Sequence, residues 1–419
     1  MPEEPKARGI WAELYVRDFL ALPFVSEFVF RSLQALDAGT QKEVADLLIA
    51  HSGIGTFPGV GILISQKTQQ DVLARDAEKT LSWALKEAKK AASQLRGALR
   101  TGRGKPIWCD HPRRGRIELP DGLPEINHGI VLLEVLERVD LNSQADNLPL
   151  QYQGTPITYL SLRDFLNIAV ELRTAPEVLA YLDARRGLLY TDLRIIGDEQ
   201  ALFEFYLLNG GSLAGCAGKA DAAIAVAARR EELDRALKSK WEDDQYSGLL
   251  EHVADQLATR RQDYASGLSV EALAAYDAPE NRSNYLEMQA VLATLSLRER
   301  SKLGRAFQGA MEKRDNSGDG FTYGALHFDS KPEWVFVFGS CAGVEPPQLN
   351  DRMQILMLAA MAFYRKTHCL IIIDREKASY EVGLRIQPSP PSSPTERVLG
   401  DRRFAHLRMT DGELALVPG

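Results

Sequence analysis

The chain has 419 residues, of which 45% are hydrophobic and 26% are charged. These values are typical of a globular protein with two or three domains. The net charge of −7 excludes a chain that is basic throughout, so a nucleic-acid site would have to be a local patch. The four cysteines form no CxxC pair and the seven histidines are dispersed, which argues against a structural zinc site and a disulfide framework.

The sequence also lacks the usual signals for membrane insertion. The first residues contain no apolar core of a signal peptide, and no apolar run reaches the ~18 residues that a membrane span requires. We therefore expect a cytoplasmic protein that has no membrane contact.

The first predicted elements lead up to two short apolar strands. Residues 9–22 have apolar side chains at a helical period, and Glu13 lies on this predicted helix. Residues 25–32 are β-branched and aromatic, which predicts a strand. Two further strands follow in KEVADLLI, which contains Asp46, and in ILISQKTQ, which contains Lys67. A loop rich in glycine joins them.

A long helix and a basic segment come next. Residues 76–101 carry one apolar stripe, and Lys86, Lys90 and Gln94 share another face of the predicted helix. We expect a loop after this helix, because the segment from Arg96 to Arg116 contains seven basic residues and one acidic residue. Residues 128–139 then predict another strand. The order is helix, three strands, helix, strand.

The remaining chain predicts a helical middle region and a last α/β unit. Residues 161–187 predict two helices, 201–215 a hairpin that turns at an Asn-Gly-Gly sequence, and 219–262 and 283–314 further helices. A strand at 333–340, a helix at 349–367 and strands at 368–376 and 379–386 follow, and then a flexible linker at 387–397. The predicted fold class is mixed α/β, with parts at 1–142, 143–275 and 276–419.

Asp46 and Lys67 are the residues that point most directly to chemistry. An aspartate among apolar neighbours is costly to bury unless it is paired or holds a metal ion. With Glu13 on the preceding helix and Gln94 on the following one, residues 1–142 resemble the restriction-endonuclease-like, or PD-(D/E)xK, nuclease superfamily. The resemblance rests on this residue set and on the order of the elements, and it implies a restriction-endonuclease-like N-terminal domain.

The resemblance implies a role for each of these residues. In that family, strand carboxylates bind one or two Mg²⁺ ions, which activate a water molecule and neutralise the phosphodiester. Asp46 would be the principal metal ligand, Lys67 would position or deprotonate the water, and Gln94 would orient the phosphate or the nucleophile. Glu13 would be the glutamate of the helix. The expected cofactor is Mg²⁺ or Mn²⁺.

The sequence departs from the family pattern at one position. The family has an acidic residue two positions before the lysine, where this chain has Ser65. Residues 65 and 67 of a strand share one face, and Gln66 points to the other. Glu43 or Glu13 could supply the missing charge, and Gln66 could contribute through a distorted strand end. Without such a replacement, we expect a fold that binds nucleic acid and does not cut it.

The basic segment after the long helix has two interpretations. It is either a loop that grips the phosphate backbone beside the site, or a solvated surface loop of an acidic protein. In the first interpretation Trp108 and His111 could stack on a base. The candidate nucleic-acid-binding residues are Arg96, Arg100, Arg103, Lys105, Arg113, Arg114 and Arg116.

Three functions remain open from the sequence. The first is a metal-dependent nuclease in bacterial defence or DNA repair. Its expected partner is nucleic acid, and DNA is expected before RNA. The second is a nuclease-fold subunit that binds nucleic acid or acts as a scaffold, with a protein partner or a second copy bound through the C-terminal domains. The third is a small-molecule enzyme that uses Cys341 in the GSCAG loop at 339–343. A calcium-like sequence at 315–320 lacks the glutamate expected at its twelfth position.

Overall fold

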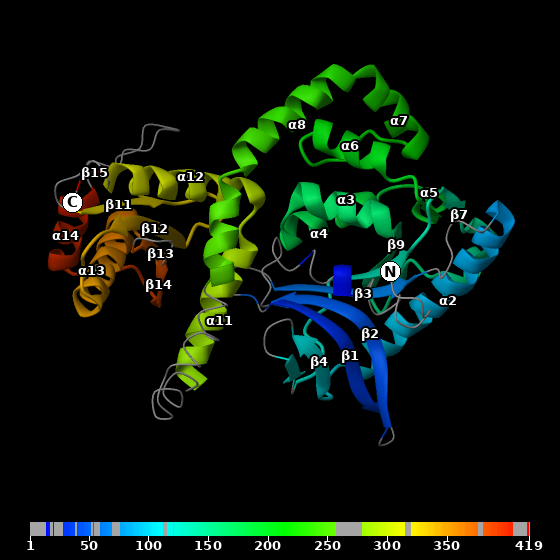
Figure 1. Cartoon of the computed structure of the whole chain (residues 1–419), viewed down its shortest axis with the longest axis horizontal. Coiled ribbons are helices and arrows are strands. Elements are labelled where there is room, and N and C mark those ends of the chain that lie inside the picture. The colour runs from blue at the N-terminus through cyan, green and yellow to red at the C-terminus, as the bar shows by residue number, and fades with distance from the viewer. Residues whose placement is uncertain are drawn as a thin grey trace. The chain divides into compact units, whose positions relative to one another are not determined.

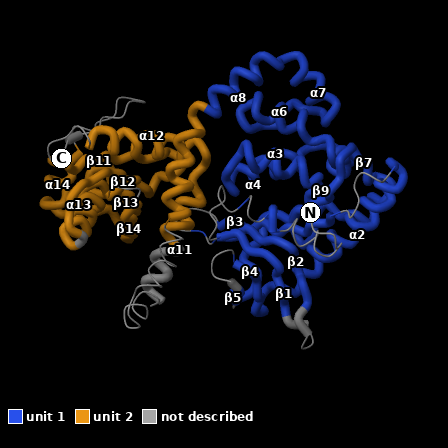
Figure 2. The backbone as a smooth tube through the Cα atoms, in the orientation of Figure 1, with its two compact units in different colours: residues 1–53, 58–241 blue, residues 54–57, 242–419 orange. Residues whose placement is uncertain are grey.

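The computed structural model describes residues 14–16, 20, 28–37, 40–51, 53, 59–68, 76–111, 115–119, 121–256, 279–314, 320–375, 380–404 and 417–418. The fold is mixed α/β, as predicted (Figure 1). It divides into two compact units, of which unit 1 comprises residues 1–53 and 58–241, and unit 2 comprises 54–57 and 242–419 (Figure 2). Within the described residues, no helix is both long enough and apolar enough to span a bilayer.

Unit 1 is organised around an eight-stranded sheet with the order β5-β4-β1-β2-β3-β6-β9-β8. Strands β1, β2 and β3 pair antiparallel in sequence, and β6 and β9 extend the sheet parallel to β3. The bounds of the strands are β1 Val29–Asp37, β2 Thr40–His51, β3 Val60–Lys67, β4 Ile107–His111, β5 Gly115–Leu119, β6 His128–Leu133, β8 Gln151–Tyr152 and β9 Thr155–Ser161. Because β9 lies in this sheet, the sheet continues past the predicted boundary at residue 142.

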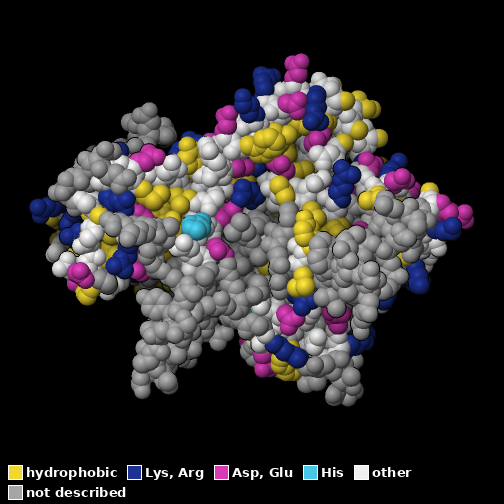
Figure 3. All heavy atoms as spheres, viewed as in Figure 1, with side chains coloured by type: hydrophobic (Ala, Val, Ile, Leu, Met, Phe, Trp, Pro, Cys, Tyr) yellow, Lys and Arg dark blue, Asp and Glu magenta, His cyan; other side chains and the backbone are white. Residues whose placement is uncertain are grey.

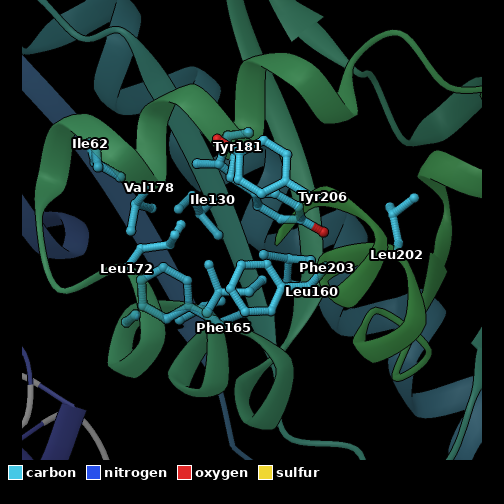
Figure 4. Close-up of a cluster of buried hydrophobic side chains, with 14 of the residues drawn as sticks. Ile62, Ile130, Leu160, Phe165, Leu172, Val178, Tyr181, Leu202, Phe203 and Tyr206 are labelled. Carbon is cyan, nitrogen blue, oxygen red and sulfur yellow. The ribbon is translucent and has the colours of Figure 1, made fainter. Parts of the chain in front are cut away.

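Helices cover both faces of the sheet of unit 1 (Figure 1). Helix α2, Ala77–Thr101, covers one face and buries mostly alanines, which let its backbone come close to the strands. On the other face, α3, α4 and α6 pack on residues of β3, β6 and β9, as the close-up of this core shows (Figure 4). The remaining elements of unit 1 are β7 Val139–Asp140, the 3₁₀ helix Asn142–Asn147, α3 Leu162–Leu172, α4 Ala175–Arg185, α5 Tyr190–Leu193, β10 Ile195–Ile196, α6 Gln200–Leu208 and α7 Lys219–Ala228. Helix α8, Arg230–Asp244, begins in unit 1, and its last three residues belong to unit 2.

A buried ion cluster joins α4 to the starts of α6 and α7. The carboxylate of Glu199 is 2.5 Å from Arg185 and 2.7 Å from Lys219, and it accepts a hydrogen bond of 2.7 Å from the Tyr181 hydroxyl. Burial alone would raise the pKa of Glu199, but the two cations outweigh it and lower this pKa to about 2. The cluster is a structural ion pair network, because one carboxylate bridges two cations and all three side chains are buried.

Unit 2 contains the predicted C-terminal α/β arrangement. Strands β12, Trp334–Cys341, and β13, His368–Asp374, are parallel and are joined through α13, Pro346–Tyr364. The predicted hairpin is confirmed, since β14, Tyr380–Ile386, pairs antiparallel with β13. The other elements are α11 Pro279–Thr294, α12 Leu297–Arg314, β11 Phe321–Leu326, α14 Pro394–Phe404 and β15 Val417–Pro418. The last four residues of the predicted linker form the first turn of α14.

Two further predictions about local structure were wrong. Residues 201–215 were predicted as a hairpin, but residues 200–208 form α6, and Gly210 and Gly211 adopt positive φ values of 62° and 85° just after its end. Part of the basic segment was predicted as a loop, but β4 and β5 form an antiparallel hairpin there that extends the sheet beside β1. Every second side chain of β4 is buried, namely Ile107, Cys109 and His111. The sequence therefore contained the two-residue period of a strand within the basic segment.

Candidate nucleic-acid interface and its buried polar centre

The centre of the site lies where β2 and β3 stop pairing. Their ladder ends at the Leu47–Ile64 pair, and the next residue of β2 towards its start is Asp46. Its carboxylate Oδ2 accepts a hydrogen bond of 2.5 Å from the backbone N–H of Gln66. This oxygen thus takes the place of the β2 backbone carbonyl with which β3 would pair if the ladder continued. Asp46 is only 3% exposed. The aspartate therefore has a structural partner in addition to any chemical role.

Three side chains converge with Asp46 on the face that α2 covers. The Lys67 ammonium is 3.3 Å from Asp46 Oδ2 and donates to Gln94 Oε1 at 3.0 Å and to the Gln66 carbonyl oxygen at 2.9 Å. The Ser65 hydroxyl lies 3.1 Å from both Asp46 Oδ2 and Gln94 Oε1, and its single proton can serve one of them at a time. Asp46, Lys67 and Gln94, which the sequence predicted as a set, thus lie together.

The opposite orientation of Gln66 is also as predicted. Its side chain points away from this centre and donates to the Thr68 hydroxyl at 3.4 Å. Its amide oxygen is buried and has no hydrogen-bond partner within the described residues. Gln66 therefore contributes its backbone N–H and carbonyl to the centre, and its side chain does not replace the missing carboxylate.

Glu43 lies at the wall of the same pocket, three residues before Asp46. It is exposed, whereas Asp46 is buried. Partial burial of its carboxyl and the negative charge of Asp46 raise the pKa of Glu43, and Lys67 and Arg31 offset part of this increase. Glu13, the other predicted carboxylate, lies outside the described residues.

The polar centre opens into a pocket between α2 and the start of β2. Its volume is about 720 Å³. Among the described residues that line it, seven are cationic and two are acidic, the acidic ones being Glu43 and Asp46. Because Lys67 is paired with Asp46, the other six cations form an exposed border, which we call the basic rim. The basic rim consists of Lys42, Lys86, Lys89, Lys90, Arg100 and Lys105.

The predicted nucleic-acid residues separate into several groups. Arg100 and Lys105 belong to the basic rim. Arg96 instead lies over the ring of Tyr152, 5.4 Å from its centroid, and Arg116 of β5 is 3.4 Å from the Gln34 amide oxygen. Arg103 is exposed, and its backbone forms an isolated bridge with Gly122. Arg113 and Arg114 lie outside the described residues.

Four members of the basic rim were missing from the predicted site. Lys86, Lys89 and Lys90 come from α2 and Lys42 from β2. A signal for two of them was present, since Lys86, Lys90 and Gln94 are spaced at four-residue intervals on one helical face. The position of Lys42 could not be predicted from helical spacing, because it depends on how β2 lies against α2.

The residues present do not fit a Mg²⁺ ion as they are arranged. Magnesium prefers an octahedron of oxygens that includes carboxylates and water. Here Asp46 is the buried carboxylate, and the Gln66 N–H already occupies its Oδ2, with Ser65 and Lys67 beside it. The two neutral oxygens nearby, from Gln66 and Gln94, both accept from Lys67. In the described part of the chain, no three His, Cys, Asp or Glu side chains are grouped so that they could hold a metal ion.

The alternative site at Cys341 shows no sign of an activated thiol. Cys341 is buried at the end of β12, and burial raises the pKa of its thiol. A nucleophilic cysteine needs the opposite shift, since the thiolate is the reactive form. The calcium-like sequence at 315–320 lies, except for Gly320, outside the described residues.

Comparisons with protein-family models, with curated proteins and with solved structures find no match to this chain.

Proposed function

We propose that unit 1 binds the phosphate backbone of nucleic acid along the basic rim. The observation that supports this most strongly is the charge of the pocket, where six exposed cations surround an aspartate whose charge Lys67 already balances. Clustered Lys and Arg residues attract phosphates and release the counterions condensed on nucleic acid. This favours a local binding patch on a chain whose net charge is −7.

The arrangement of the cations favours a polymer over a single small anion. Lys86, Lys89, Lys90 and Arg100 lie on α2 and all line the pocket. At 1.5 Å per residue, the row from Lys86 to Arg100 is ~21 Å long. Phosphates of one strand in duplex DNA follow each other every ~3.4 Å along the helix axis, so such a row could meet several of them.

Helix α8 provides a contrast, because its four Lys or Arg residues stand among six Asp or Glu residues. On α8, cationic and acidic side chains are interspersed on the face that Figure 3 shows. Arg229, just before the helix, pairs with Glu232 at 2.7 Å, and Arg230 pairs with Asp234 at 3.1 Å. Cations that are balanced locally in this way attract phosphate weakly. In the basic rim, within the described residues, an ion pair is seen for Lys90, whose partner Glu87 is 3.9 Å away.

The test is equilibrium binding of labelled oligonucleotides, followed by fluorescence anisotropy over a range of salt concentrations. The full chain is used with single-stranded and duplex DNA and RNA, in the presence of EDTA. The Lys86→Gln/Lys89→Gln variant removes two charges from the rim, and Arg235→Gln/Lys238→Gln removes two charges from α8 as a matched control. We expect weaker binding for the first variant alone. Equal losses for both would refute a local site.

Hydrolysis of phosphodiesters is the second candidate function. It is supported by the convergence of Asp46, Lys67 and Gln94, the residues on which the resemblance to PD-(D/E)xK nucleases rests. A role in bacterial defence or DNA repair, in the cytoplasm, would suit such an activity. Plasmid degradation with Mg²⁺ or Mn²⁺ tests it, with Asp46→Ala and Lys67→Ala as variants. Cleavage that survives both substitutions would remove this assignment.

A further inference from the structure

Three oxygens of different kinds surround the Lys67 ammonium. They are the Asp46 carboxylate oxygen Oδ2 at 3.3 Å, the Gln94 amide oxygen Oε1 at 3.0 Å and the Gln66 backbone carbonyl oxygen at 2.9 Å. They come from β2, α2 and β3, so three separate elements build this oxygen cage. Carboxylate, amide and carbonyl oxygens are also the ligands that hard divalent cations use in proteins.

We propose that the Lys67 ammonium is the resident cation of this oxygen cage and that it keeps divalent ions out. An ammonium has three N–H donors, and three oxygens are in place to accept them. The side chain of Lys67 is 14% exposed and that of Asp46 is 4% exposed, so the pair is shielded from water. A metal ion at the same oxygens would displace these hydrogen bonds and repel the ammonium at close range.

Ser65 explains why the single positive charge of Lys67 is sufficient to balance the oxygen cage. The serine hydroxyl lies where the nuclease pattern has a second carboxylate, and it adds no charge to the cage. One carboxylate and one ammonium therefore balance, whereas a divalent ion added beside the ammonium would leave two uncompensated positive charges, against one if Lys67 were absent. This inference does not depend on nucleic-acid binding, and it predicts the opposite of metal-dependent hydrolysis for the natural chain.

The proposal predicts that removal of the ammonium creates a divalent-cation site. In the Lys67→Ala variant, Asp46 Oδ2 and the two neutral oxygens lose their cation, and the deleted side chain leaves space for a hydrated ion. Mn²⁺ is the probe, with free and bound ion measured by electron paramagnetic resonance and by calorimetry. We expect at least tenfold tighter Mn²⁺ binding by Lys67→Ala than by the natural chain, and loss of that gain in Lys67→Ala/Asp46→Asn.

Two results would overturn the proposal. One is Mn²⁺ binding by the natural chain that Asp46→Asn abolishes, because the cage would then accept a metal ion with Lys67 present. The other is a folded Lys67→Ala variant, checked by circular dichroism, that binds Mn²⁺ no more tightly than the natural chain. If Lys67→Ala does not fold, Lys67→Gln takes its place, since a neutral amide of similar length removes the charge and keeps hydrogen bonding.

Discussion

The pairing of Asp46 with Lys67 should contribute measurably to the stability of unit 1. In Asp46→Asn the ammonium keeps two neutral acceptors and loses its counter-charge, and breaking a buried ion pair on one side costs ~3 kcal/mol or more. In Lys67→Met the carboxylate keeps its hydrogen bond from the Gln66 N–H, so we expect a smaller loss of about 2 kcal/mol. The double variant should lose about 3 kcal/mol, since the two residues form one interaction, and this leaves a coupling energy of about 2 kcal/mol.

Native-state hydrogen exchange is the suitable assay because the chain has two units. Peptides from β3 and α2 report the free energy of opening around the site, and peptides from β12 and β13 of unit 2 serve as an internal control. For Asp46→Asn, a loss of ~3 kcal/mol corresponds to roughly 100-fold faster exchange in unit 1. Unit 2 peptides should not change.

A matched surface pair provides the second control. Lys79 and Asp76 form an ion pair of 2.9 Å at the start of α2, with side chains that are 71% and 58% exposed. Solvent screens such a pair, so Lys79→Met should leave the exchange of α2 unchanged beyond its first turn. A coupling energy near zero between Asp46 and Lys67 would refute the view that the oxygen cage depends on their charges.

Three further predictions concern titration and the buried ion cluster. Because the pKa of Glu43 is raised, this residue takes up a proton at higher pH than a free glutamate does; oligonucleotide affinity should therefore increase more steeply towards pH 5 in the natural chain than in Glu43→Gln, as anisotropy can measure. Burial lowers the pKa of His128 from 6.5 to about 3. Below pH 6.5 the unfolded chain binds a proton at His128 that the folded chain does not, so the free energy of unfolding decreases as the pH is lowered, by about 2 kcal/mol at pH 5. In His128→Gln, acid unfolding should lack this loss of about 2 kcal/mol. Glu199→Gln would leave Arg185 and Lys219 buried without their counter-charge; we expect a loss of about 3–5 kcal/mol in unit 1 by hydrogen exchange.

The strands that carry the site were predictable because their signal is local. Buried strands such as β3 and β6 appear as short apolar runs, and α2 as a long stripe of period 3.6. Helix α6 was missed because an Asn-Gly-Gly sequence marks a backbone with positive φ, and such a backbone follows helices as well as hairpin strands. The β4–β5 hairpin was not predicted because each of its strands has five residues, too few for the alternation along β4 to stand out among the surrounding charged residues.

The site itself was predictable in part. The convergence of Asp46, Lys67 and Gln94 follows from their spacing on two strands and a helix, once the order of the elements is known. The way in which Lys67 uses all three donors does not follow from spacing, since it depends on a carbonyl of β3 and on the distance of α2 from the sheet. The basic rim depends on the same distance, which alanines at the α2 interface set.

The salt dependence of oligonucleotide binding tests the central claim most directly. If all six cations of the basic rim meet phosphates of a duplex, the logarithm of the affinity should fall with the logarithm of salt concentration with a slope of about −5. In EDTA, Lys86→Gln/Lys89→Gln should make this slope shallower by about 2, and Arg235→Gln/Lys238→Gln should leave it unchanged. A slope that is the same in the natural chain and in the rim variant would contradict binding at this pocket.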